Sequence, residues 1–206
     1  MPQTVPQCSI DRGPAAATHQ LRYTVYSERV MGKRYDRIDA KLAAWIGRQR
    51  LFFVATAPEA GGHVNVSPKG PIGSLRVAGE HTLEYDDHVG SGAETAAHLR
   101  QNARICVMLC DFEGPPRVLR LHGRGEVLPA ADPGEAGVRA VIRVHVERIS
   151  DSCGYGVPLL EYAGERPQRE AWLANKGADG VRDYVRDRNA ESIDGLPAFG
   201  VPGTAL

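Results

Sequence analysis

The chain has 206 residues, of which 42% are hydrophobic and 24% charged, a composition typical of a globular protein with one sizeable core. Its 25 lysines and arginines balance 25 aspartates and glutamates, so the net charge gives no sign of binding to nucleic acid or to a membrane surface, or of an acidic tail. A small molecule is the expected partner. The N-terminus lacks a secretory signal, and no apolar run approaches the ~18 residues of a membrane span, which favours a cytoplasmic protein.

The beginning of the chain differs in character from the rest. Residues 1–30 are rich in Pro, Ala, Thr and Gln and show no sustained hydrophobic period. This composition predicts a flexible N-terminal extension. The remainder, residues 31–206, is expected to form a single domain.

The first predicted element is an amphipathic helix that starts after Asp36 and ends near Arg50. Asp36 is the expected N-cap, and Asp39 places a negative charge in the first turn. The positions that recur at helical spacing are Ile38, Leu42, Trp45, Ile46 and Gln49.

Strand patterns dominate the middle of the chain. In the last of them, apolar residues from Val138 to Val146 alternate with Arg139, Arg143 and His145, which predicts one buried face and one polar face. The arginines of that polar face are interpreted either as solvated or as the positive lining of an interface groove. The predicted strands cover residues 51–57, 63–67, 74–77, 81–85, 104–110, 117–128 and 138–149.

About seven strands with few helices between them must close on themselves or pack as a sandwich to remove their edges. We predict a small barrel in a mainly β (α+β) chain. Helices are expected from residue 91 to about 102 and over residues 168–188. The four cysteines and seven histidines fall in no spacing typical of a metal site, and no metal is predicted.

A glycine-flanked turn precedes the helix expected after residue 91. Ser91 and Glu94 have the spacing of a capping box, and Gly90 and Gly92 flank the serine. The free N–H groups and the dipole of such a helix start suit a phosphate. Taken alone, the pattern favours simple capping between Ser91 and Glu94, because capping boxes are common.

A second feature is a lysine at the end of a strand. Lys69 stands between Pro68 and Gly70, where a point positive charge could meet a phosphate, although an ordinary surface lysine has the same pattern. A cation at a strand end and a helix start some twenty residues on together predict one phosphate pocket.

Longer strings resemble a known family. Residues 52–58 (Phe-Phe-Val-Ala-Thr-Ala-Pro), 63–70 (His-Val-Asn-Val-Ser-Pro-Lys-Gly) and 90–95 (Gly-Ser-Gly-Ala-Glu-Thr) are similar to the pyridoxamine 5′-phosphate oxidase-like proteins. The similarity continues through residues 153–158 and 192–197 and so covers most of the chain from about Met31. It implies a split β-barrel of about six to seven antiparallel strands with a few flanking helices, assembled as a homodimer with FMN at the subunit interface.

The resemblance also implies which residues contact the cofactor. The strand through residues 65–67 would offer backbone groups to the edge of the isoalloxazine, and the lysine and helix start would hold the phosphate. An arginine on a later strand would reach the flavin from the neighbouring strand or from the other subunit. The cofactor-binding residues implied in this way are Asn65, Val66, Ser67, Lys69, Ser91, Gly92, Thr95 and Arg120.

Departures from the pyridoxine-making enzymes of this family narrow the expected function. Their arginine at the start of the phosphate strand is Val64 here, and their Ser-Arg-Lys run is Ser91-Gly92-Ala93, so two cations are missing. Pyridoxine phosphate oxidation is therefore not expected. We expect an FMN-dependent oxidoreductase acting on a small-molecule substrate or acceptor, with no catalytic side chain assigned because the flavin carries the chemistry. A non-catalytic flavin- or haem-binding protein and an F420-dependent reductase on the same fold stay open as alternatives.

Overall fold

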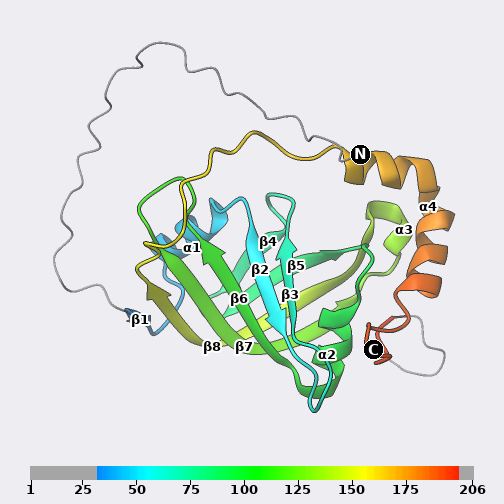
Figure 1. The fold of residues 1–206 in the computed structure, drawn as a ribbon, viewed down its shortest axis with the longest axis horizontal. Helices are drawn as coiled ribbons and strands as arrows, with labels where there is room; N and C mark the ends of the chain where they lie inside the picture. The colour runs from blue at the N-terminus through cyan, green and yellow to red at the C-terminus, as the bar shows by residue number, and fades with distance from the viewer. Residues whose placement is uncertain (1–31, 200–206) are drawn as a thin grey trace, which may run out of the picture.

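The computed structural model describes residues 32–199, so the extension predicted over residues 1–30 lies outside the described residues. Within that range eight strands and four helices follow one another (Figure 1). In chain order they are β1 (Arg34–Tyr35), α1 (Ala40–Gly47), β2 (Phe52–Thr56), β3 (Asn65–Lys69), β4 (Leu75–Gly79), β5 (Thr82–His88), α2 (Glu94–Asn102), β6 (Arg104–Cys110), β7 (Val118–Pro129), α3 (Pro133–Ala136), β8 (Val138–Ser152) and α4 (Gln168–Arg188).

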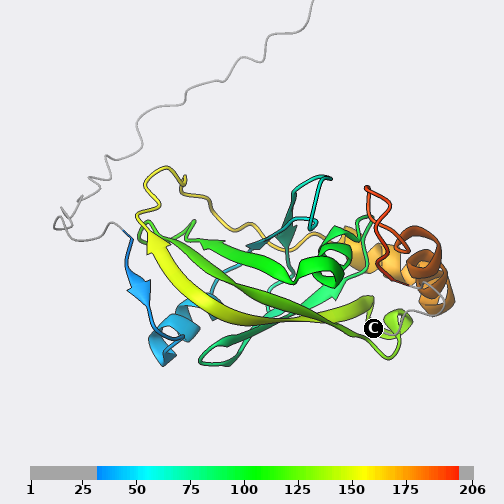
Figure 2. The same ribbon diagram turned by 90° about the horizontal axis from the view of Figure 1, so that it is seen from below.

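The strands form one antiparallel sheet in the order β3-β2-β6-β7-β8-β5-β4, and β1 pairs with the end of β8. Figure 2 shows the long strands β7 and β8 bending, so that the sheet curves around its own core. β3 and β4 stand at the two ends of the strand order, and the barrel is open there. The fold is therefore the mainly β split barrel that the sequence predicts, with the two-residue β1 added to the seven expected strands.

The core lies inside the curve of the sheet and follows the alternation of its strands. In β5 every second residue from Leu83 to Asp87 is buried, and β6 repeats this pattern. Burying each large apolar side chain contributes roughly 1.5–3 kcal/mol, so the strands of the middle of the sheet supply much of the stability. The fully buried apolar side chains include Leu83, Val107, Leu109, Leu119, Leu121, Ile142 and Val144.

Helix α1 begins at Ala40, later than the sequence pattern predicts. Its N-cap is Asp39, whose Oδ1 accepts the Leu42 N–H at 2.7 Å, so the expectation that Asp36 caps the helix is wrong. The reason lies in the preceding residue: Ile38 donates its N–H to the Glu80 carbonyl at 2.8 Å, which ties this part of the chain to the β4–β5 turn.

Helix α2 begins at Glu94 without the predicted capping box. Its N-cap is Ala93 and no side chain caps it. The Glu94 carboxylate instead accepts the Ile193 N–H at 3.3 Å, and the carbonyl of Gly92 accepts from Arg139 at 2.7 Å. Contacts with distant parts of the chain therefore replace the local reciprocal capping that the spacing of Ser91 and Glu94 suggests.

The remaining helices lie at the end of the molecule away from α1, as Figures 1 and 2 both show. α4 spans Gln168–Arg188 as predicted, and a non-helical φ of 65° at Gly177 divides it into two helical parts. The four-residue α3 was not expected from the sequence. No helix between residues 32 and 199 is long and apolar enough to cross a membrane.

Candidate functional site

A cavity of about 310 Å³ lies between the end of β3, strand β5 and the start of α2. Ser67, Lys69, Gly92 and Thr95, four of the eight residues that the sequence suggests for cofactor binding, line it. The structure thus brings the strand-end lysine and the glycine-flanked helix start to one place. This is the arrangement that the two sequence features together predict.

Behind the cavity one carboxylate holds two cations. Asp87 of β5 has a fully buried side chain, and its Oδ1 accepts from Lys69 Nζ at 2.8 Å. Its Oδ2 accepts from Arg139 Nε at 2.9 Å. Burial by itself would raise the pKa of the Asp87 carboxyl, but Arg139 and then Lys69 outweigh burial and hold that pKa below its usual value. Asp87 is therefore ionised and fixes both cations beside the cavity.

Arg139 also lines the cavity, although the sequence analysis placed it on the polar face of the last strand. Only 5% of the residue is exposed. β5 and β8 change register between the pairs Asp87 with Ala140 and His88 with Val138, so Arg139 is an extra residue without a partner in this ladder. Such a bulge interrupts the alternation and here turns the arginine inward. No local signal in the sequence identifies this contact, because the partner Asp87 lies beyond the strand predicted over residues 81–85.

The Arg139 guanidinium has hydrogen-bonding capacity left over. Nη2 donates to the Gly92 carbonyl, and the ring of Phe199 lies 4.9 Å from the guanidinium carbon. Nη1 is buried and has no hydrogen-bond partner within residues 32–199. Lys69 uses one of its three donors on Asp87. With two cations against one bridging carboxylate, this cluster carries one net positive charge and unused donors, which fits a phosphate.

Other carboxylates also line the cavity, and both have partners elsewhere. Asp86 is paired with Arg76 through two hydrogen bonds of 2.9 and 2.8 Å. Glu94 accepts from the Ile193 N–H, as described above. The cavity is therefore lined by both positive and negative side chains. Asp86 and Glu94 form their hydrogen bonds with residues other than Lys69 and Arg139.

Asn65 acts behind the cavity and does not line it. Its Nδ2 donates to Thr95 Oγ1 at 3.2 Å and to Thr56 Oγ1 at 3.3 Å, and its Oδ1 accepts from Ser67 Oγ at 2.9 Å. Thr56 is in turn 3.0 Å from Nδ1 of His98, whose pKa is lowered by burial, so the ring is neutral. This network ties β3 to α2 and orients the two hydroxyl groups that do line the cavity.

The other three predicted cofactor residues lie elsewhere. Val66 points to the opposite side of β3, with 62% of the residue exposed, and Ser91 is exposed and does not line the cavity. Arg120 lies on β7, where its Nη1 donates to Ser152 Oγ at 3.2 Å. Three strand spacings separate β3 from β7, about 14 Å, so Arg120 does not join Lys69 within one chain.

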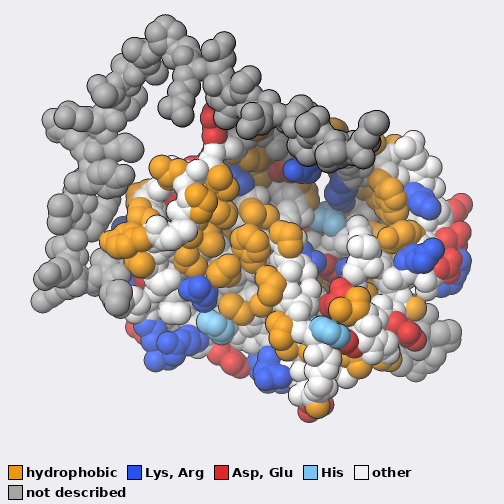
Figure 3. All heavy atoms as spheres, in the orientation of Figure 1, with side chains coloured by type: hydrophobic (Ala, Val, Ile, Leu, Met, Phe, Trp, Pro, Cys, Tyr) orange, Lys and Arg blue, Asp and Glu red, His pale blue; other side chains and the backbone are white. Residues whose placement is uncertain are grey.

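Val66 belongs to an apolar outer face of the sheet. The pairing of β2 with β3 and β6 sets Ala55 beside Val66 and Cys106, and sets Phe53 beside Met108. Figure 3 shows hydrophobic side chains gathered over this part of the molecule. β3 is also an edge strand, paired with β2 alone, so one side of its backbone has no partner strand among the described residues.

The segment after α4 packs against residues around the cavity and was not anticipated from periodicity. Asn189 Nδ2 donates to the Gly90 carbonyl at 2.9 Å. His63 donates its backbone N–H to Asp194 at 2.9 Å, and its ring Nδ1 lies 2.7 Å from the same carboxylate, and these contacts lower the pKa of Asp194. The segment thereby joins the β2–β3 hairpin to the start of α2.

The fold and the site define a split-barrel protein in which a buried carboxylate holds two cations beside a cavity at an edge strand. A family model described as pyridoxamine 5′-phosphate oxidase matches residues 38–174, and the chain belongs to that family. It is 37% identical over 193 residues to the pyridoxamine 5′-phosphate oxidase family protein ustO of Aspergillus flavus, covering 80% of this chain and 77% of that protein.

Similar solved structures share smaller parts of the fold. A FAD-binding protein from Mesorhizobium loti is 17% identical, with a TM-score of 0.40 over 58% of this chain and 96% of that chain. An FMN-binding protein from Syntrophomonas wolfei is 14% identical, with a TM-score of 0.40 over 58% of this chain and 84% of that one. HupZ of Group A Streptococcus is 27% identical, with a TM-score of 0.44 over 54% and 91%.

Proposed function

We propose that this chain binds FMN and acts as an FMN-dependent oxidoreductase on a small-molecule substrate or acceptor. The observation that carries the proposal is the pair of cations, Lys69 and Arg139, that Asp87 holds beside a cavity at the start of α2 in a chain of this family. When bound, FMN supplies the hydride or electron transfer. The residues of the chain bind, orient and shield it.

The phosphate of FMN is assigned to the cavity. Lys69 and Arg139 Nη1 supply charged donors, and the Thr95 hydroxyl and the free N–H groups at the start of α2 supply neutral ones. Arg139 takes the place of a missing cation, because Val64 and Gly92 stand where the pyridoxine-making enzymes of the family carry arginine. The same departures argue against pyridoxine phosphate as the substrate.

The isoalloxazine is assigned to the free edge of β3 and its apolar outer face. A planar ring needs apolar surface and a few backbone groups, and β3 presents both beside Val66. A second copy of the chain would cover this exposed face, which motivates the homodimer. Arg120, about 14 Å from β3 within one chain, would then reach the flavin from the partner subunit.

The first experiment is an absorbance spectrum from 300 to 700 nm of the purified protein, followed by mass spectrometry of the molecule that acid or heat releases. We expect the bands of oxidised flavin and the mass of FMN. A Soret band would instead indicate haem, and the mass of F420 would indicate the deazaflavin. A colourless protein that takes up no added FMN would contradict the proposal.

Two further measurements separate binding from catalysis. Lys69→Ala should lower FMN retention at least about ten-fold, whereas Lys176→Ala on the exposed side of α4 should leave it unchanged. Turnover is then followed with added acceptors after the flavin has been reduced. Catalytic reoxidation supports an oxidoreductase, and stoichiometric binding without turnover supports a flavin-binding protein instead.

A further inference from the structure

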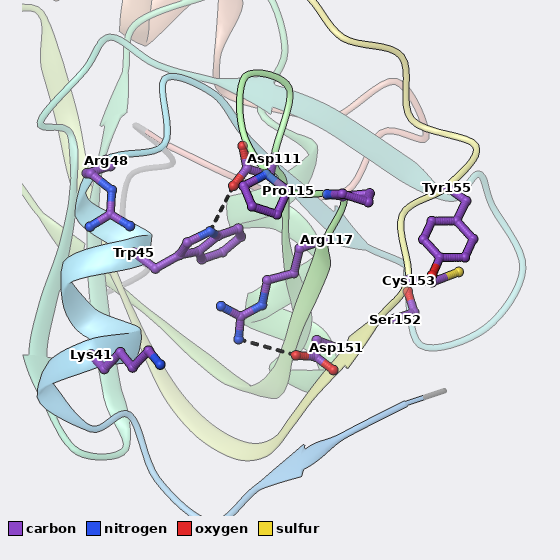
Figure 4. Close-up of a pocket in the computed structure, with 11 residues that line it drawn as sticks. Lys41, Trp45, Arg48, Asp111, Pro115, Arg117, Asp151, Ser152, Cys153 and Tyr155 are labelled. Atoms are coloured by element: carbon purple, nitrogen blue, oxygen red, sulfur yellow. Dashed lines mark hydrogen bonds and ion pairs between the residues drawn. The ribbon is translucent and has the colours of Figure 1, made fainter. Parts of the chain in front are cut away.

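A second cavity, of about 550 Å³, lies at the α1 end of the molecule (Figure 4). Helix α1, the loop between β6 and β7, and the segment after β8 line it. It shares no residue with the phosphate cavity. Arg139 and Ser152 stand 13 positions apart on β8, which corresponds to about 40 Å of extended strand. The two cavities therefore lie near opposite ends of the same strand.

The middle of this second cavity is occupied by Arg117. Figure 4 shows its side chain between Trp45 and Asp151, and its guanidinium carbon lies 4.6 Å from the centroid of the Trp45 ring. Nη2 donates to Tyr35 Oη at 2.7 Å and lies 3.3 Å from Asp151 Oδ2. The arginine is thus held rigidly by stacking and by hydrogen bonds on one side.

Both carboxylates that line this cavity already have donors from the protein. Asp111 accepts from Trp45 Nε1 at 3.0 Å and from the Gly114 N–H at 2.7 Å. Asp151 accepts from Tyr35 Oη at 2.5 Å and from the backbone of Lys33 at 3.1 Å. The negative charge of both carboxylates is therefore stabilised by hydrogen-bond donors of the protein.

Two cations that line the cavity, Lys41 and Arg48, have no carboxylate partner among residues 32–199, although Arg48 Nη1 donates to the Ala44 carbonyl at 3.1 Å. Lys41 lies on α1 and Arg48 directly follows its last residue, and both lie on the same side as Trp45 and line the cavity. Neither forms an ion pair with a carboxylate in the described part of the chain. Figure 4 shows Lys41 and Arg48 towards the two ends of α1, with Trp45 between them. The α1 side of the cavity is therefore positive.

Pro115 and Tyr155 contribute apolar surface to the cavity from segments other than α1. Gly154 has a φ of 66°, and a Cβ there would lie 2.6 Å from the Arg117 backbone nitrogen, so glycine allows the segment after β8 to pack directly against the start of β7. This close approach holds Tyr155 at the cavity, which Pro115 also lines. Tyr155 is 71% exposed, so this aromatic side chain has little to pack against among residues 32–199.

We propose that this second cavity binds a small organic anion with a planar apolar body, of the aromatic carboxylate class. The cations of α1 would meet the carboxylate, and Tyr155 and Pro115 would cover the ring. The size of the cavity suits such a ligand. The proposal does not depend on FMN, because the lining residues are separate from those of the phosphate cavity.

Tryptophan fluorescence tests the proposal directly. The chain has two tryptophans, so Trp172→Phe leaves Trp45, which lines the cavity, as the sole reporter. We expect saturable quenching by 4-nitrobenzoate, with an affinity about ten-fold higher than that of the uncharged 4-nitrobenzamide. Raising the salt concentration should reduce the difference. Equal affinities, or quenching that never saturates, would overturn the proposal.

Charge-removal variants identify the site. Lys41→Gln with Arg48→Gln should lower the affinity for 4-nitrobenzoate to that of the amide, and both side chains are exposed, so folding should be unaffected. Lys176→Gln with Arg188→Gln removes the same charge from α4 and should change nothing. An equal loss in both double variants would overturn the proposal.

A calorimetric titration separates this cavity from the flavin site. 4-Nitrobenzoate is titrated into protein without FMN and into protein saturated with FMN. An unchanged affinity supports a separate site. Loss of binding in the presence of FMN would mean that the cavity belongs to the flavin site, and the proposal would be wrong. If the protein binds no FMN, the proposed function fails while the fluorescence experiment still tests this cavity.

Discussion

The Arg139 guanidinium donates from Nε to Oδ2 of Asp87 at 2.9 Å, and the two side chains are 4% and 0% exposed. An ion pair this deeply buried is stable only when both partners are present, because each charge alone has lost its water. Lys69 adds a second cation to the same carboxylate. The cluster therefore makes stability and anion binding depend on the same three side chains.

Asp87→Asn should lower the free energy of unfolding by about 3–5 kcal/mol in urea denaturation at pH 7, because two cations lose their shared carboxylate. Since the folded protein lowers the pKa of Asp87, the stabilisation is present above the unfolded pKa of about 4 and is lost as the pH falls below it. The difference between the wild type and Asp87→Asn should shrink at low pH. Asp86→Asn, which removes a partly exposed pair with Arg76, should cost about 1 kcal/mol or less. Equal losses in the two variants would contradict this assignment.

Arg139→Gln should reduce the affinity for FMN about ten-fold or more, while the affinity for riboflavin, which has no phosphate, changes little. The ratio of the two affinities removes any general loss of stability from the comparison. Arg143→Gln is the matched control, because Arg143 lies on the same strand, pairs with Glu84 and is 39% exposed. A parallel loss for both ligands would show that Arg139 supports the fold and does not hold the phosphate.

Gly123→Ala should destabilise the protein by about 3 kcal/mol, because overpacking without room to relax is costly. β7 and β8 change register after His122, and a Cβ at Gly123 would lie 2.0 Å from the carbonyl oxygen of His145. Gly47→Ala, in a helix with nothing within 4 Å, should instead be neutral or stabilising by up to about 1 kcal/mol. Chemical denaturation of the two variants measures the change in the free energy of unfolding, which should fall for Gly123→Ala and stay the same or rise for Gly47→Ala.

Tyr35→Phe should remove one phenol that ionises only at a pH well above that of an ordinary tyrosine. Burial, followed by the hydrogen bond to Asp151, raises the pKa of Tyr35 to about 12. The folded pKa exceeds the unfolded value of about 10, so the stabilisation is present below pH 10 and declines as the pH rises towards 12. The difference between the 295 nm titrations of wild type and variant should have its midpoint near 12. A midpoint near 10 would show that Tyr35 is freely solvated.

The bounds of some elements are predicted correctly from the sequence. Strand Arg104–Cys110 and helix Gln168–Arg188 begin and end where their patterns indicate. β1 and α3 were missed because two and four residues are too short to show a period. The N-cap of α1 was placed three residues early, because a distant contact of Ile38 with Glu80 decides where the helix starts.

The candidate site is predicted in part, and the part that fails has one cause. Lys69 and Thr95 meet at the cavity because a strand end and a helix start carry their own local signals. Arg139 has no such signal: strict alternation assigns it to the polar face, and a bulge of one residue reverses that assignment. The pairing of Asp87 with two cations joins three strands, so no local pattern contains it.

Pro68 lies within β3, the strand at the edge of the sheet. An edge strand can pair with a strand of another molecule, and repeated pairing of this kind leads to aggregation. Proline opposes the pairing because it has no N–H to donate. The edge that we assign to the flavin therefore carries its own protection against aggregation. A protein of this design can keep backbone groups open for a cofactor and still avoid polymerising through them.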